Sequence, residues 1–178
     1  MSYCSDLTRE RIMECAKAEF LKKGFQAAQL KDIVAAAKVT TGAVYRHFKD
    51  KEALFFALIE DVYHYTLDFL DNVESYDTVG IKEAIERDSI ESSYMQAMKY
   101  VNYMYEHFEE YQLLLKYSKG SRVENFIEEI ADQYTKQNAQ FVKAAYEAGY
   151  AKCLPSDTHF DAWIYYCTMR VYFARRSL

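Results

Sequence analysis

Residues 40–51 gather side chains that suit contact with a polyanion. Small and polar residues come first, in Thr40-Thr41-Gly42-Ala43, and a Tyr-Arg-His-Phe cluster and two lysines follow soon after. Hydroxyl, imidazole and ammonium groups donate hydrogen bonds to phosphate oxygens, and small side chains let a helix approach base edges. This combination is typical of a helix that is presented to the major groove of DNA.

Hydrophobic spacing predicts short helices that hold this segment. Leu30, Ile33, Val34 and Ala37 recur at helical spacing, and Val44 with Phe48 predicts a buried side for the next helix. A first helix begins near Asp6 or Thr8, and Gly24 supplies its stop signal. The three helices are expected over about residues 8–24, 29–37 and 41–47, with a turn at 38–40. They predict a three-helix helix-turn-helix module.

The remainder of the chain also predicts helices. One proline and five glycines in 178 residues favour long helices over a turn-rich β-fold. Asp50 is a good N-cap for a long helix to about residue 74, which we expect to link the first module to the next. A loop is expected over residues 72–80, and later helices over about 90–108, 112–117, 123–148 and beyond Pro155. The predicted fold is therefore all-α, with residues 1–50 as the DNA-binding domain and 51–178 as a second helical domain.

The charge distribution agrees with this division. The net charge is −5, but residues 8–56 hold ten Lys or Arg against six Asp or Glu, a balance of +4. The rest of the chain therefore carries −9. A basic module joined to an acidic one fits DNA binding at one end and a different task at the other.

The N-terminal pattern resembles the TetR family of transcriptional repressors. The matching residues, in order, are Gly24-Phe25, Asp32-Ile33, Val39 to Phe48, and Lys51-Glu52-Ala53-Leu54. The chain departs from the family pattern at two places. Ala28 and Gln29 stand where Thr or Ser usually caps the second helix, and Lys38 stands where the turn usually has glycine.

The resemblance implies roles for residues at the DNA-facing end. Thr40, Thr41, Gly42 and Ala43 open the recognition helix, and Thr41 is expected to donate to a base or a phosphate. The remaining expected DNA contacts are Lys31, Tyr45, His47 and Lys51, which bind phosphate, and Arg46, which faces either solvent or the groove.

The resemblance also implies that residues 51–178 bind a small-molecule effector and form a homodimer. Two-fold symmetry would then set two recognition helices about 34–36 Å apart on a palindromic operator. Candidate effector-binding residues, which mix apolar surface with polar tips, are Tyr94, Met98, Asn102 and Tyr134. The expected function is a ligand-responsive transcriptional regulator, acting as a repressor that the effector releases from DNA.

Other classes of protein fit the sequence less well. An alternative is a DNA-binding regulator that is controlled by a protein partner or by thiol oxidation, and a remote one is a helical-bundle enzyme. No Glu-x-x-His pair, nucleophile elbow or phosphate-binding glycine loop is present, so we expect no enzyme, cofactor or metal. The four cysteines are scattered, which favours reduced thiols. We find neither a signal peptide nor an apolar run that would span a membrane, so a cytoplasmic protein is expected.

Overall fold

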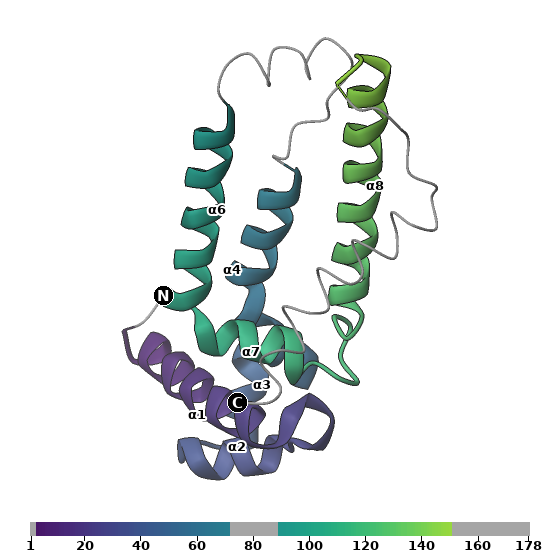
Figure 1. Ribbon diagram of the computed structural model, residues 1–178. Helices are drawn as coiled ribbons and strands as arrows, with labels where there is room; N and C mark the ends of the chain where they lie inside the picture. Colours follow the sequence, from purple (N-terminus) through teal and green to yellow (C-terminus); the bar gives the residue numbers. More distant parts are fainter. Residues whose placement is uncertain (1–2, 72–88, 151–178) are drawn as a thin grey trace. The chain divides into compact units, whose positions relative to one another are not determined.

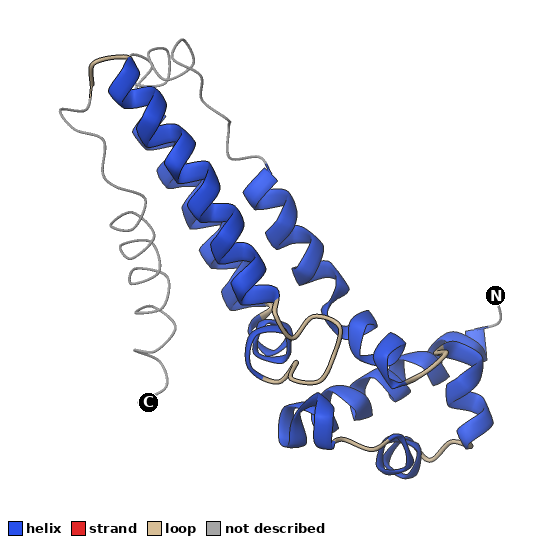
Figure 2. Ribbon diagram, turned by 90° about the vertical axis from the view of Figure 1, so that its right-hand side faces the viewer, coloured by secondary structure: helices blue, strands red, loops and turns tan. Residues whose placement is uncertain are grey.

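The computed structural model describes residues 3–71 and 89–150, and all regular structure in these residues is helical (Figure 2). The helices are α1 (Tyr3–Ala27), α2 (Leu30–Ala37), α3 (Thr41–His47), α4 (Lys51–Asp71), α6 (Ser89–Glu106), α7 (Phe108–Lys116) and α8 (Phe126–Glu147) (Figure 1). The all-α prediction is confirmed. The loop expected over residues 72–80 and the helix expected beyond Pro155 lie outside the described residues.

The helices divide into two compact units. The first unit holds α1, α2, α3, the part of α4 up to Thr66, and residues 103–126, which include α7. The second unit holds the end of α4, α6 as far as Asn102, and α8. The first unit therefore extends beyond the helix-turn-helix module that the sequence predicted.

The core of the first unit forms around the apolar face of α1. Ile12, Ala16 and Phe20 lie at helical spacing and are fully buried. The Phe20 and Phe25 rings each lie 5.0 Å from the ring of Phe55 on α4, both in edge-to-face geometry. Aromatic pairs at this distance add to the stabilisation that burial gives. This cluster fixes the start of α4 against α1.

Gly24 interrupts α1, as the stop signal at this position predicted. Its φ of 74° and ψ of 164° lie outside the helical region, in a conformation that is almost restricted to glycine. The break turns the next residue so that the Phe25 N–H donates to the Tyr117 carbonyl at 2.8 Å. The end of α1 is thereby bound to the segment that follows α7.

Acidic residues of α7 bind a lysine of α1 in the same unit. The Lys17 Nζ lies 2.7 Å from Glu110 Oε1 and 3.1 Å from Glu109 Oε2. Burial, the largest single effect, opposes ionisation of Glu110, but the hydrogen bond from Lys17, a backbone hydrogen bond and the charge of Lys17 together outweigh it and hold the pKa of the carboxyl below its ordinary value. The hydrogen bond with Glu110 likewise raises the pKa of Lys17, against the effect of its own partial burial.

Helices α6 and α7 are separated at His107, although the sequence predicted one helix through residue 108. His107 has φ −111° and ψ 38°, so the chain leaves helical geometry for one residue. The new direction buries Tyr111, Leu113 and Leu114. The Tyr111 hydroxyl then lies 2.9 Å from that of Thr66, within the core.

In the second unit, α6 and α8 each contact the end of α4. The rings of Phe69 and Tyr100 stack at 4.3 Å between centroids, and the Gln137 amide donates to the Leu70 carbonyl at 3.0 Å. Gly149, with φ 83°, follows the end of α8, where the sequence placed a stop signal. None of the described helices combines the length and the apolar character that a bilayer span requires.

Candidate nucleic-acid interface

The turn between α2 and α3 is closed by two backbone hydrogen bonds. The Lys38 N–H donates to the Ala35 carbonyl at 3.2 Å, and the Val39 N–H donates to the Val34 carbonyl at 3.2 Å. This pattern is the Schellman motif, which needs a left-handed residue at the helix end. Lys38 supplies it with φ 52° and ψ 45°. For a residue other than glycine or asparagine, this conformation costs about 1 kcal/mol.

Thr40 starts α3 by capping it. Its backbone is extended, and its Oγ1 accepts a hydrogen bond from the Ala43 N–H at 3.2 Å. Such a cap stabilises a helix by roughly 1 kcal/mol, which matters for a helix of seven residues. The predicted contact residue Thr40 therefore has a structural role at the same position.

Burial of one side of α3 decides which residues the helix presents to solvent. Val44 is 1% exposed and Phe48, which follows the helix, is 5% exposed. The guanidinium of Arg9, on α1, lies 5.4 Å from the centre of the Phe48 ring. With these residues turned inward, the opposite side of α3 faces solvent and carries the polar side chains.

The structure brings most of the predicted DNA contacts together on this exposed side. Tyr45 is 52% exposed, although an apolar ring of this size is usually packed. Ala43 and His47 are half-buried at the edge of the same side. The other exposed members of the predicted set are Thr40, Thr41, Gly42 and Arg46 on or beside α3, and Lys31 on α2.

Lys51 is placed differently from the other predicted contacts. Its Nζ donates to the Phe25 carbonyl at 2.8 Å and to the Ala28 carbonyl at 3.1 Å, and lies 4.4 Å from the centre of the Phe25 ring. An ammonium group has three N–H donors, so these two bonds leave one for a phosphate. The first role of Lys51 is therefore to join α4 to the end of α1, and its DNA contact stays a prediction.

The N-terminus of α2 has no side-chain cap, in agreement with the departure seen in the sequence. Gln29 is extended and its side chain makes no capping bond, while Ala28 is buried. Its first turn is instead joined to α1 by Lys23, which lies 2.9 Å from Asp32 and 2.6 Å from Glu19. The hydrogen bond from Lys23 lowers the pKa of Asp32. Because this ion pair is exposed to solvent, it adds little to stability.

The contribution of α7 and of the segment that follows it to this unit was not predicted from the sequence. Besides Lys17 with Glu109 and Glu110, the Arg122 N–H donates to Glu52 Oε1 at 3.1 Å, and its guanidinium lies 3.6 Å from the centre of the Phe56 ring. These partners lie about 70 to 90 residues apart in the chain. No local pattern pairs them, so only the folded structure could find them.

Three of the four predicted effector-binding residues have described side chains, and all three are exposed. Met98 and Asn102 are exposed and lie one turn apart on α6, and Tyr134 on α8 is 39% exposed. The side chain of Tyr94 lies outside the described residues. Within the described part of the chain, no group of three His, Cys, Asp or Glu side chains is placed to hold a metal ion.

A known protein family that this chain resembles matches it over the N-terminal unit, which carries the candidate DNA-binding surface. Residues 12–58 match the family described as "Bacterial regulatory proteins, tetR family". The transcriptional regulator TtgR of Pseudomonas putida is 42% identical over 73 residues, which are 40% of this chain and 34% of TtgR. The probable acrEF/envCD operon repressor of Escherichia coli is 46% identical over 48 residues, 27% of this chain and 22% of that protein. The matches thus span about a third or less of these relatives.

A solved structure, the SmeT–triclosan complex, aligns with 96% of this chain and 82% of its own, at 22% identity and a TM-score of 0.47. This similarity is too low to carry an argument about a ligand. The sequence matches instead lie over the helices that present the polar side of α3. The relatives matched over these helices are a transcriptional regulator and a probable operon repressor. By its residues and its geometry, the segment 12–58 is an N-terminal domain of the TetR family of bacterial regulatory proteins.

Proposed function

We propose that this regulator is a repressor that binds a palindromic operator as a homodimer and leaves it when a small-molecule effector binds. The observation that carries the proposal is the polar, solvent-facing side of α3, backed by buried Val44 and Phe48. A helix this short is stable only because its other side is packed, so its exposed side is a rigid surface. A rigid polar helix of this kind fits the major groove.

The proposed contacts follow from side-chain chemistry and exposure. Thr41 and Ala43 lie in the first turn of α3 and read base edges, where hydroxyl and methyl groups distinguish bases. Tyr45 and His47 bind phosphate, with Lys31 and Lys51 as further phosphate partners. The exposed guanidinium of Arg46 reaches either a base edge or a phosphate.

Effector control is assigned to the remainder of the chain. We place DNA binding in residues 1–50, and dimerisation and effector binding in residues 51–178, with Tyr94, Met98, Asn102 and Tyr134 as candidate contacts. Helix α4 runs without interruption from Lys51 to Asp71, so a shift of its far end is carried to its first turn. A coupling of about 1–3 kcal/mol between the two sites is enough to release DNA. We also propose that the protein acts in the cytoplasm, where its DNA partner lies.

Selection of bound duplexes from a random DNA pool tests the central claim. We expect a palindrome with half-sites one helical turn, about 34–36 Å, apart or a multiple of it. Recovery of no common sequence, or of an asymmetric one, would overturn the proposal of a dimeric operator-binding protein.

A matched pair of variants then tests whether α3 is the binding surface. Tyr45→Phe removes one hydroxyl from an exposed ring and should weaken operator binding about 5- to 10-fold per subunit, as expected for one lost solvent-exposed hydrogen bond of roughly 1–1.4 kcal/mol. Tyr150→Phe removes the same group from a ring that is 47% exposed beyond α8, and should leave binding unchanged. Equal affinities for wild type and Tyr45→Phe would remove this hydroxyl from the interface.

A thermal-shift screen tests the effector. A compound that binds the folded protein raises the melting temperature by mass action. We expect at least one lipophilic or aromatic compound to do so and also to lower operator affinity. A compound that raises the melting temperature while operator affinity stays constant would contradict release by an effector.

A further inference from the structure

Lys38 occupies a conformation that its side chain disfavours. Among the residues that the structure describes, it is the one non-glycine residue with positive φ. It closes α2 and stands two residues before Thr40, the cap of α3. Strained backbone of this kind persists where the surrounding structure or the function requires it.

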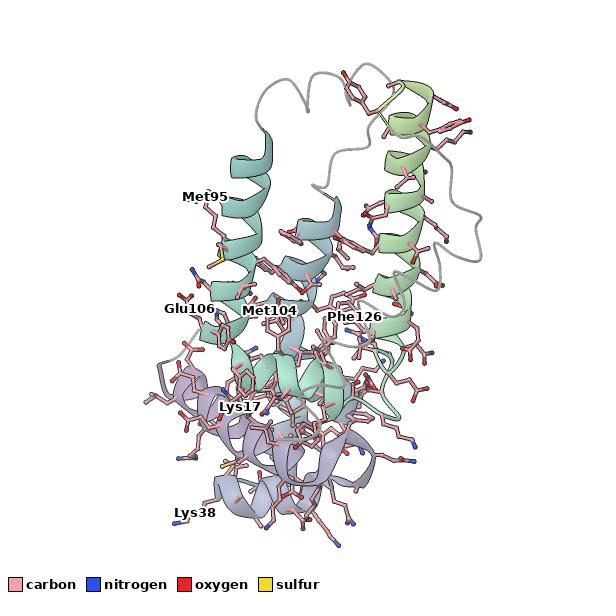
Figure 3. All side chains as sticks on the ribbon, in the orientation of Figure 1. Lys17, Lys38, Met95, Met104, Glu106 and Phe126 are labelled. Atoms are coloured by element: carbon pink, nitrogen blue, oxygen red, sulfur yellow. The ribbon has the colours of Figure 1, made fainter. Side chains whose placement is uncertain are left out.

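The fold itself gives no reason for a lysine at this place. The two hydrogen bonds of the turn use the N–H groups of Lys38 and Val39, which glycine at position 38 would supply equally well. The Lys38 side chain is exposed and projects past the outline of the ribbon (Figure 3). Within residues 3–71 and 89–150, its ammonium group makes no hydrogen bond or ion pair. Glycine would therefore form the same turn with less strain.

The position of the charge suggests what it binds. The ammonium is attached beside the first turn of α3, where Thr41 and Gly42 are exposed. Phosphate groups line both sides of the groove that such a helix enters, and lysine binds phosphate as a compact point charge on a flexible stem. A cation at this point therefore lies where a groove-bound α3 meets the DNA backbone.

We propose that Lys38 is a phosphate-binding residue of the DNA interface, placed there by a strained turn at the expense of folding stability. The inference rests on the proposed DNA binding and adds a contact to it. A phosphate contact raises affinity for every sequence alike and adds to the salt dependence of binding. Lys38 thus contributes to affinity and register, and not to the choice of bases.

Three substitutions separate charge from strain. Lys38→Gly removes both and should raise the melting temperature by about 2–4 °C while weakening DNA binding. Lys38→Gln removes the charge alone and should weaken binding to the same extent without the gain in melting temperature. Lys38→Arg keeps the charge and should retain the wild-type salt dependence. Lys136→Gln, at an exposed lysine of α8, is the control for the change in net charge.

The measurement is operator affinity as a function of salt concentration, with the DNA recovered by the selection described above. Each lost phosphate contact lowers the slope of log affinity against log salt by about 0.9, and two subunits double this. For a dimer, the ratio of wild-type to Lys38→Gln affinity should therefore be about 12-fold larger at 50 mM than at 200 mM salt.

The possible results separate this contact from DNA binding itself. A wild-type slope for Lys38→Gln, or an equal loss of slope in Lys136→Gln, would overturn the contact while DNA binding stands. A wild-type protein that enriches no DNA sequence would overturn the proposed function and the contact with it. A melting temperature for Lys38→Gly at or below that of wild type would overturn the claim of strain.

Discussion

Lys51→Met tests whether the lysine that begins α4 holds the N-terminal unit together. Lys51 donates to the carbonyls of Phe25 and Ala28, at 2.8 and 3.1 Å, and so joins the start of α4 to the end of α1. Methionine keeps most of the aliphatic stem against the Phe25 ring but leaves both carbonyls without this donor. We expect the variant to fold and to be clearly less stable than wild type.

The magnitude follows from the two bonds. A hydrogen bond that involves a charged group contributes about 1.5–3 kcal/mol when it is well shielded. Lys51 is half-buried, so water replaces part of each bond in the variant, and roughly 1 kcal/mol per bond is the better figure. The expected loss is therefore about 2 kcal/mol, or a fall of about 4–8 °C in melting temperature for a chain of this size.

The assay is equilibrium unfolding in urea, followed by helical circular dichroism, for wild type, Lys51→Met and Lys49→Met. Lys49 is exposed and stands two residues earlier, so its variant has the same change in charge and composition. The free energy of unfolding of Lys49→Met should lie within about 0.5 kcal/mol of the wild-type value, as is usual for surface substitutions. If Lys51→Met were also within that range, the two carbonyl bonds would contribute nothing and the reasoning would be refuted.

The same variant separates the two roles of Lys51. At a temperature where all three proteins are folded, a lost phosphate contact lowers the salt slope of operator binding by about 0.9 per subunit. A loss of stability with an unchanged slope would assign Lys51 to the fold alone. A loss of both would show that its third N–H donor reaches DNA.

Three further predictions concern the rest of the first unit. Gly24→Ala should lower the free energy of unfolding by roughly 1–3 kcal/mol through the backbone alone, because the added Cβ would lie an ordinary 3.7 Å from the Tyr117 carbonyl oxygen. Tyr111→Phe removes the hydroxyl that lies 2.9 Å from the Thr66 hydroxyl in the core. It should lower the free energy of unfolding, measured in urea, by about 1 kcal/mol. Glu110→Gln should change the pH dependence of stability on the acid side. Since the folded pKa of Glu110 lies below its ordinary value of 4.5, its ionised form stabilises the protein above pH 4.5, and this contribution disappears as the pH falls through the folded value. The difference between wild type and Glu110→Gln should therefore be largest near neutral pH and should vanish in acid.

Each of these has an outcome that would contradict it. Wild-type stability in Gly24→Ala would mean that residue 24 can relax into the helix. An unchanged urea midpoint for Tyr111→Phe would show that the hydroxyl pair is no more favourable than its separate hydration. Stability curves for wild type and Glu110→Gln that stay parallel from pH 7 to pH 3 would exclude the Lys17 bond as the cause of the shift.

Local signals in the sequence were sufficient where the structure is decided locally. The predicted helices over 29–37 and 41–47 lie within one residue of α2 and α3. Asp50 caps α4 as expected, since its Oδ1 accepts the Ala53 N–H at 2.8 Å. Gly24 and Gly149 both mark real changes of backbone direction, with positive φ. In each case the residue type acts on its own neighbours, so the pattern can be read without the fold.

Where distant residues decide the structure, local patterns offer no such guide. The break at His107 has neither proline nor glycine, and the burial of Tyr111 and Leu114 in the first unit determines it. The bond between Lys17 and Glu110 joins residues 93 positions apart. A lysine and a glutamate on two helices are usually exposed and unpaired, so nothing in their spacing predicts that they meet.

The family pattern itself combines two kinds of residue that the structure separates. Phe48 packs in the core, Thr40 caps α3, and Lys51 binds the end of α1, so a domain that never met DNA would still need all three. A match at such positions is evidence for the fold and says little about the ligand.

The exposed positions of the pattern carry the functional argument instead. Within the described residues, the side chains of Thr41, Tyr45 and Arg46 make no hydrogen bond, ion pair or ring contact that would explain their presence. An aromatic ring that is 52% exposed contributes little to folding, because most of its apolar surface stays in water. Since the fold does not require these three side chains, the agreement of Thr41 and Tyr45 with the pattern supports a partner that is bound by the outer side of α3. Substitutions there report on DNA binding with little change in stability, whereas substitutions at Thr40 or Lys51 change both.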